Sequence, residues 1–148
     1  MTNAFTFDEI EIGYTFDGPR VDVTRGMIKE FAMASFDNNP LHWDDDYIAQ
    51  TTFANGKKFD TVIGHGLMTY SIMVRAMTDW LWPDNGEHRR METRFRSPVY
   101  PGDTIQVRVE VVDKKKSRKG KWLVCSVTVE NQRGQVVATG DSLAEVLR

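Results

Sequence analysis

Apolar and polar residues alternate with a period of two through much of the second half of the chain, which is typical of strands with one buried face. The clearest example is residues 105–111, where an isoleucine and three valines alternate with glutamine, arginine and glutamate. Residues 131–134 indicate a tight hairpin turn and residues 114–120 a longer one, while residues 14–16 and 21–23 are short extended pieces. We therefore predict an antiparallel meander of four strands, residues 89–95, 103–113, 121–130 and 135–147.

The first half of the chain mainly predicts helices. Thr24 is a good N-cap for a helix over residues 25–35, which carries an apolar stripe. This helix must end before Pro40, because proline disfavours helical backbone in the residue that precedes it. Aspartates at residues 44–46 favour the start of a short helix over residues 45–52, since carboxylates suit a helix N-terminus.

Residues 67–81 predict the longest helix, which follows the sequence Gly64-His65-Gly66. Its apolar residues lie nearly all round the helix, and such a helix is normally buried. The buried face of the meander is its obvious partner. The expected fold class is therefore α+β, with a long central helix wrapped by a curved antiparallel sheet.

The composition, 41% hydrophobic and 27% charged, is that of one globular domain over residues 1–148. The net charge of -2 gives no general attraction to nucleic acid or anionic membranes, so neither is an expected partner. Residues 1–12 lack the apolar core of a signal peptide, and charged residues make the most apolar run, residues 62–82, a poor membrane span. Cys125 is the only cysteine and is expected to be a small buried residue, which fits a cytoplasmic location.

The candidate chemistry lies in the turn after the first predicted helix. It places Asp37 and His42 five residues apart, with Pro40 between them. A carboxylate and an imidazole that converge on one point can hold and activate a water molecule. Spacing alone leaves the alternative open, in which Asp37 merely ends a helix and His42 is a loop histidine.

Three motifs accompany this pair in order: DNNPLHWD at residues 37–44, IGHG at residues 63–66 and FRSPVYPGDT at residues 95–104. Together they resemble the MaoC-like dehydratases of the hotdog fold, a family that includes the (R)-specific enoyl-CoA hydratases. The resemblance covers about residues 7–146. It implies reversible addition of water to a trans-2-enoyl-CoA, which gives a 3-hydroxyacyl-CoA. It also implies a homodimer or a dimer of dimers, with the active site at a subunit interface and no cofactor beyond the coenzyme A of the substrate.

The resemblance also assigns roles to individual residues. Asp37 and His42 match the catalytic pair of the family, and the resemblance does not say which one is the base. The glycines around His65 match the segment whose backbone amide binds the thioester carbonyl; Gly66 is the favoured oxyanion donor and Gly64 the neighbouring candidate, since unpaired amides at a helix N-terminus suit this task. Asn39 and His65 complete the expected substrate-binding set, with a supporting role favoured for His65.

Two features depart from the family pattern, and both are expected to reshape the acyl pocket. Phe36 stands before the candidate catalytic Asp37, at a position where the family often has glycine. The segment over residues 53–61 is longer and more polar than usual.

Other interpretations of the same residues are weaker. His42 with the aspartates at residues 44–46 resembles a metal cluster, but consecutive aspartates point in different directions, so no metal is expected. The basic residues between 114 and 121 are expected to form a solvated hairpin tip rather than a site for coenzyme A phosphates. A hotdog thioesterase would lack the Asp37–His42 turn, and a non-catalytic acyl-CoA-binding subunit of a heteromeric hydratase would be expected to lose the pair. The hydratase or dehydratase is therefore the leading hypothesis.

Overall fold

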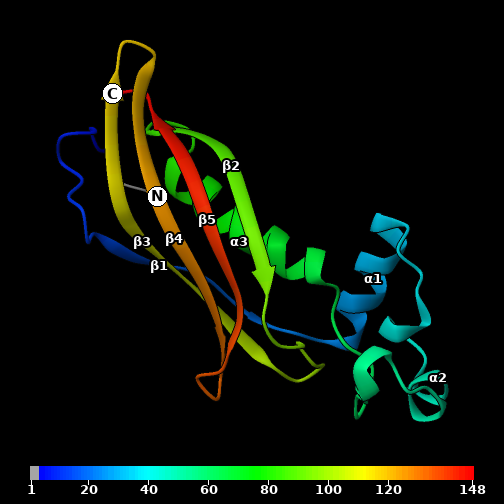
Figure 1. The fold of residues 1–148 in the computed structure, drawn as a ribbon. Coiled ribbons are helices and arrows are strands. Elements are labelled where there is room, and N and C mark those ends of the chain that lie inside the picture. Colours follow the sequence, from blue (N-terminus) through cyan, green and yellow to red (C-terminus); the bar gives the residue numbers. More distant parts are fainter. Residues whose placement is uncertain (1–3) are drawn as a thin grey trace.

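The protein folds into a curved antiparallel sheet that wraps around one long helix (Figure 1). The structure is a computed structural model that describes residues 4–148, so the first three residues of the expected domain lie outside it. The sheet has the strand order β1-β3-β4-β5-β2. Its strands are β1 (Thr15–Asp22), β2 (Gly86–Phe95), β3 (Thr104–Ser117), β4 (Gly120–Asn131) and β5 (Val136–Val146). The predicted α+β class with a central helix is confirmed.

The order of the strands differs from a simple four-stranded meander. Strands β3, β4 and β5 form the meander, but β2 pairs with β5 and not with β3, its neighbour in sequence. The two extended pieces predicted near the N-terminus are one strand, β1, which joins the other edge of the meander beside β3. A register irregularity between Asp17 and Arg20 interrupts that pairing and explains why the sequence pattern breaks there.

The prediction of a long turn at residues 114–120 was wrong. The ladder between β3 and β4 continues to the pair Ser117 and Gly120, so only Arg118 and Lys119 remain in the turn. A register shift between Val111 and Asp113 lets the strands continue beyond the regular apolar alternation. Most of the basic run therefore lies on paired strands rather than in a solvated loop.

The predicted helices are present, with small changes at their ends. Helix α1 (Arg25–Ser35) matches its predicted bounds, and Thr24 Oγ1 accepts a hydrogen bond from Met27 N at 3.2 Å as the predicted N-cap. Helix α2 (Asp45–Gln50) ends two residues early, and α3 (Gly66–Leu81) begins one residue early. Short 3₁₀ turns, η1 (Pro40–His42) and η2 (Ala54–Gly56), connect these helices. Figure 1 shows α1 and α2 gathered beyond the N-terminal end of α3.

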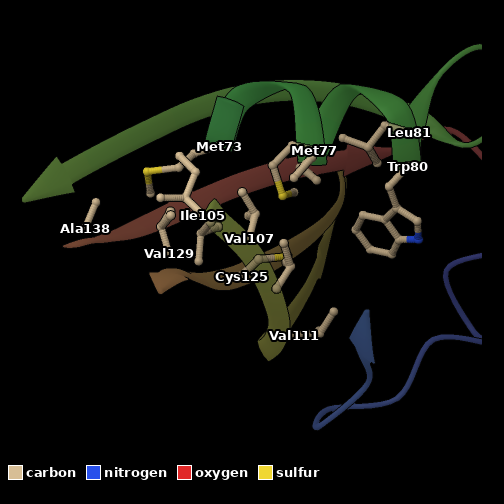
Figure 2. Close-up of a cluster of buried hydrophobic side chains, with 14 of the residues drawn as sticks. Met73, Met77, Trp80, Leu81, Ile105, Val107, Val111, Cys125, Val129 and Ala138 are labelled. Atoms are coloured by element: carbon tan, nitrogen blue, oxygen red, sulfur yellow. The ribbon is translucent and has the colours of Figure 1, made fainter. Parts of the chain in front are cut away.

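The core lies between α3 and the concave face of the sheet. Figure 2 shows Met73 and Met77 extending from α3 into a layer of strand side chains that includes Cys125. Cys125 is fully buried as predicted, and burial raises the pKa of its thiol to about 12. The expectation that α3 is buried all round was wrong, because a single sheet covers one side only and leaves Leu67 58% exposed. None of the helices within residues 4–148 is long and apolar enough to cross a membrane.

Candidate active site

The turn that carries Asp37 and His42 is held by its own hydrogen bonds. Asn39 Oδ1 accepts from Leu41 N at 3.0 Å, while the Asn39 backbone amide makes a long contact of 3.4 Å with Asp37 Oδ1. Pro40 begins the η1 turn, where its missing amide hydrogen is no loss. The side-chain oxygen of Asn39 therefore caps the turn, a positioning role that adds to the substrate-binding role expected from the resemblance.

The turn brings Asp37 and His42 together as predicted. His42 Nε2 lies 3.8 Å from Asp37 Oδ2, which is too long for a direct hydrogen bond. A water oxygen about 2.8 Å from each atom fits between them. The imidazole of His42 is 9% exposed, whereas the carboxylate of Asp37 is 49% exposed and reaches solvent. The pair therefore has one buried and one open member, at a separation that one water can bridge.

The buried environment sets the protonation of His42. Its Nδ1 lies 2.7 Å from the carbonyl oxygen of Ile63, which only accepts, so Nδ1 carries the hydrogen and Nε2 presents a lone pair toward Asp37. Burial lowers the pKa of His42, and the neighbouring His65 lowers it further; the Ile63 carbonyl and the Asp37 carboxylate oppose this shift. His42 is therefore neutral near pH 7, with Nε2 free to accept a proton.

His65 packs directly against this pair. Its ring stacks on His42 with the ring centroids 3.7 Å apart and the planes 22° apart. His65 Nε2 lies 3.1 Å from the backbone oxygen of Asp37, and it must donate because that oxygen only accepts. His65 is only 2% exposed, so it holds the turn from the protein interior rather than by contact with substrate. This geometry fits the supporting role expected for His65.

Asp37, His42 and His65 also bring one possible metal-ligand atom each within 4.8 Å of one another. An ion must lie close to the plane of each imidazole that binds it, and the planes of these two stacked rings are nearly parallel. The arrangement therefore suits proton transfer better than metal binding. Asp44 caps the start of α2, since its Oδ1 accepts from Tyr47 N at 3.0 Å. Asp45 lies in the first turn of α2 as predicted, and its Oδ1 accepts from the hydroxyl of Thr61 at 2.7 Å.

The candidate oxyanion donor lies at the N-terminus of α3. The Gly64 amide donates to Val99 O at 2.8 Å, so it is already engaged. Among the residues that the structure describes, none accepts a hydrogen bond from the Gly66 amide, as expected for the first residue of a helix. A Cβ at Gly66 would lie 3.0 Å from the ring of Phe95, which shows how closely the ring covers this point. Gly66 therefore remains the candidate donor.

His42, Gly64 and Gly66 line one cavity of about 320 Å³. Neither Asp37 nor Asn39 is part of this lining. The polar segment over residues 53–61 contributes two residues to the lining of the cavity. The lining consists of Leu41, His42, Lys57, Phe59, Ile63, Gly64, Gly66, Thr69, Phe95, Arg96, Ser97, Pro98, Val99 and Val137.

Lys57 and Phe95 are among the lining residues that were not singled out from the sequence. The available signals were their positions, since Lys57 lies in the unusual polar segment and Phe95 begins the third motif. A larger cavity of about 590 Å³ lies between β1 and α3 and is bordered by the rings of Phe16 and Trp80. That cavity contains none of the predicted site residues.

Phe36 is explained by the backbone at the end of α1. It caps the helix with φ 61° and ψ 12°, a left-handed conformation that glycine adopts without strain. The ring is 87% exposed and is not part of the cavity at His42, so the expected effect of Phe36 on the pocket is not seen.

Replacing Phe36 with glycine is expected to raise the free energy of unfolding by about 1 kcal/mol, because it removes left-handed strain and loses little packing. Urea unfolding measures this change. Met33→Gly is the control: Met33 is 67% exposed in the interior of α1, where glycine should destabilise by roughly 0.5–1 kcal/mol. A loss of stability in Phe36→Gly would contradict the assignment of strain.

Comparison with known proteins gives a consistent result. A family model described as "MaoC like domain" matches residues 8–133. The chain is 28% identical over 140 residues to a 3-hydroxybutyryl-CoA dehydratase of Methylorubrum extorquens, covering 95% of this chain and 83% of that protein. It is also 28% identical over 140 residues to an (R)-specific enoyl-CoA hydratase of Rhodospirillum rubrum, covering 95% and 90% of the two chains. The structure of the R-hydratase PhaJ1 of Pseudomonas aeruginosa is similar, with a TM-score of 0.78 and 25% identity over 95% of this chain and 84% of that one.

Proposed function

Because the chain belongs to the MaoC-like dehydratase family, a family of hydro-lyases, we propose that it adds water reversibly to a trans-2-enoyl-CoA to give a 3-hydroxyacyl-CoA. The observation that carries the proposal is the pairing of Asp37 Oδ2 with a neutral His42 Nε2 at 3.8 Å. Two proton acceptors at this separation hold one water by both of its hydrogens. The lone pairs of the water oxygen are then free to attack a carbon.

Gly66 is the proposed site of the thioester carbonyl. As water adds to C3, negative charge develops on the thioester oxygen, and a donor aimed at that oxygen stabilises the transition state. The Gly66 amide is a donor at the N-terminus of α3, where the helix dipole also favours negative charge. Gly66 and His42 line the same cavity, which lets one substrate meet both.

The proposed proton path uses the Asp37–His42 pair twice. In hydration, the water O–H bond breaks as the oxygen bonds to C3, and His42 Nε2 receives the proton while the Asp37 carboxylate stabilises the resulting imidazolium. The pair then returns a proton to C2 as the enolate collapses, so no proton is gained or lost overall. Dehydration follows the same steps in reverse. The thioester supplies the activation of the double bond.

The pH dependence of the reaction tests the role of His42. Since the proposed base is neutral His42, kcat/KM for hydration should fall as the pH decreases and this residue becomes protonated. Burial lowers the pKa of His42, so the midpoint of that fall is expected below pH 6.5, the ordinary value for histidine. Rates across pH 5–8, with the His42 ring followed by NMR, measure both quantities. A fall in kcat/KM that is centred above pH 6.5, or that does not follow the titration of the His42 resonance, would count against His42 as the base.

The direct test of the function is an assay with crotonyl-CoA, in which loss of the enoyl absorbance reports hydration. We expect 3-hydroxybutyryl-CoA to accumulate without release of free thiol. Release of coenzyme A would instead identify a thioesterase. Binding of the thioester without turnover would identify a non-catalytic subunit, and either result would contradict the proposal.

The proposed assembly is a homodimer or a dimer of dimers. Leu67 and Phe95 are large apolar side chains that are 58% and 54% exposed near the site, and exposed apolar surface commonly marks an interface. Strands β1 and β2 are the two edges of the sheet within the described chain, so each offers an unpaired ladder to another copy. Sedimentation should give two or four times the 17.0 kDa chain mass, and a monomer would contradict the proposal.

A further inference from the structure

Thr69 brings a buried hydroxyl to the cavity that contains His42 and Gly66. It lies in the first turn of α3 and is 3% exposed. Within the described chain, His42 and Thr69 are the buried polar side chains of this lining, since its lysine, arginine and serine are all more exposed. Buried hydroxyls normally have a hydrogen-bond partner, so an unused one beside a candidate site requires an explanation.

The hydroxyl of Thr69 is not used by the helix itself. A hydroxyl in a helix can donate to the carbonyl four residues earlier, as Ser71 does to Leu67 O at 2.8 Å. For Thr69 that carbonyl belongs to His65, and it already accepts two amides, Met68 N at 3.1 Å and Thr69 N at 3.3 Å. Within residues 4–148 the Thr69 hydroxyl makes no other hydrogen bond. The donor is therefore free for a group that enters the cavity.

The Thr69 hydroxyl and the Gly66 amide lie on the same side of α3. Residues three apart in a helix are neighbours on one face, and a helical side chain covers the turn on the N-terminal side of its own Cα. Thr69 therefore extends back toward the level of Gly66, and both residues line the same cavity. The Gly64 amide is engaged by Val99 O at 2.8 Å, so it does not supply a second free donor.

We propose that the Thr69 hydroxyl and the Gly66 amide together form the oxyanion site, with both hydrogens directed at the carbonyl oxygen of the thioester. This inference rests on the proposed hydration of enoyl thioesters and adds a catalytic residue to that reaction. A carbonyl oxygen has two lone pairs, so it accepts from both donors at once. The oxygen gains negative charge as water adds to C3, so the two donors stabilise the transition state more than the substrate.

Thr69→Ser and Thr69→Ala isolate the hydroxyl, because both variants lack the methyl group and only the serine variant keeps the donor. We expect kcat for crotonyl-CoA to be about 10²–10³-fold lower in Thr69→Ala than in Thr69→Ser, the usual effect of losing one oxyanion donor. KM should differ little, since the hydrogen bond strengthens as charge develops. Thr78→Ala is the matched control and should keep the wild-type rate, because Thr78 lies on α3 outside the cavity lining and donates to Arg75 O at 3.2 Å.

The infrared C=O stretch of bound crotonyl-CoA reports the hydrogen bond directly. It is measured in the His42→Ala protein, where the substrate stays bound without rapid turnover. A hydrogen bond to a carbonyl lowers its stretching frequency, so adding Thr69→Ala should raise the frequency, whereas adding Thr69→Ser should leave it close to that of His42→Ala alone. A role of Thr69 in packing alone would not produce this difference.

The inference is overturned if folded Thr69→Ser and Thr69→Ala proteins have equal kcat values, even where both are less stable than the wild type, because Thr69 then serves packing alone. It is also overturned if the C=O stretch has the same frequency with serine and with alanine at this position. Failure of the wild type to hydrate crotonyl-CoA would instead reject the proposed function itself. The infrared comparison separates the two failures, because it depends on binding of the thioester and not on its hydration.

Discussion

Replacing His42 with alanine is expected to reduce kcat for enoyl-CoA hydration by about 10²–10⁴-fold, the usual contribution of a positioned general base. The variant removes Nε2, the lone pair that faces Asp37 across 3.8 Å and would accept the proton of the attacking water. Asp37→Asn is expected to cause a loss in the same range, because an amide neither accepts a proton nor stabilises the imidazolium. Steady-state hydration of crotonyl-CoA measures both effects.

The double variant provides a sharper test than either single variant. Asp37 and His42 are proposed to act on the same water, so the combined loss should be much smaller than the product of the single losses. Asp46→Asn is the control, since Asp46 is an exposed carboxylate close in sequence and outside the cavity lining. It should retain the wild-type rate. Folded Asp37→Asn and His42→Ala proteins that hydrate crotonyl-CoA normally would refute the proposed role of the pair.

The second large effect is on stability. Met77→Ala is expected to lower the free energy of unfolding by about 2–5 kcal/mol, the usual cost of removing a long apolar side chain from a packed core. Met77 is fully buried, and Figure 2 shows it filling the space between α3 and the strands. Truncation removes its contacts with the valines of the sheet and leaves a cavity that the sheet cannot readily close.

Urea unfolding of both proteins at the same protein concentration measures this loss. Met33→Ala is a control with identical chemistry, because Met33 is 67% exposed on α1 and its truncation should change stability by less than about 0.5 kcal/mol. Equal effects of the two substitutions would show that α3 is not packed against the sheet as described. A Met77→Ala protein with an unchanged unfolding midpoint would lead to the same conclusion about the packing of α3.

Local sequence patterns were enough to predict most of the individual elements. The alternation at residues 105–111 predicted the buried face of β3, because side chains in a strand point to opposite sides in turn. Thr24 predicted the start of α1, since its hydroxyl satisfies an otherwise unpaired amide of the first turn. These signals concern neighbours in the chain, so they do not depend on what packs against the element.

The arrangement of the elements was less predictable. Residues 89–95 predicted a strand, but nothing in them indicates that the strand pairs with β5 rather than β3. The apolar residues around α3 suggested complete burial, whereas one sheet covers only one side of the helix and leaves Leu67 exposed. Periodicity indicates which positions prefer burial. It does not indicate which surface, in this chain or in another copy, covers those positions.

The candidate site shows the same division between what local sequence predicts and what the tertiary arrangement decides. The sequence by itself determined that Asp37 and His42 lie on one short turn, and the motif order predicted Gly66 at the start of the central helix. Only the tertiary structure decided the state of His42, because the Ile63 carbonyl and the stacked ring of His65 come from residues more than 20 positions away. The electric field and burial around an imidazole depend on all atoms within a few ångströms, whatever their distance along the chain.

The lining of the cavity is also a tertiary property. Lys57 and Phe95 are 38 positions apart in the sequence, and folding brings both to the cavity that contains His42. The sequence by itself therefore predicted the candidate acid–base pair, because its two members are close together in the chain. The tertiary structure decided which side chains surround this pair, because they come from separate segments.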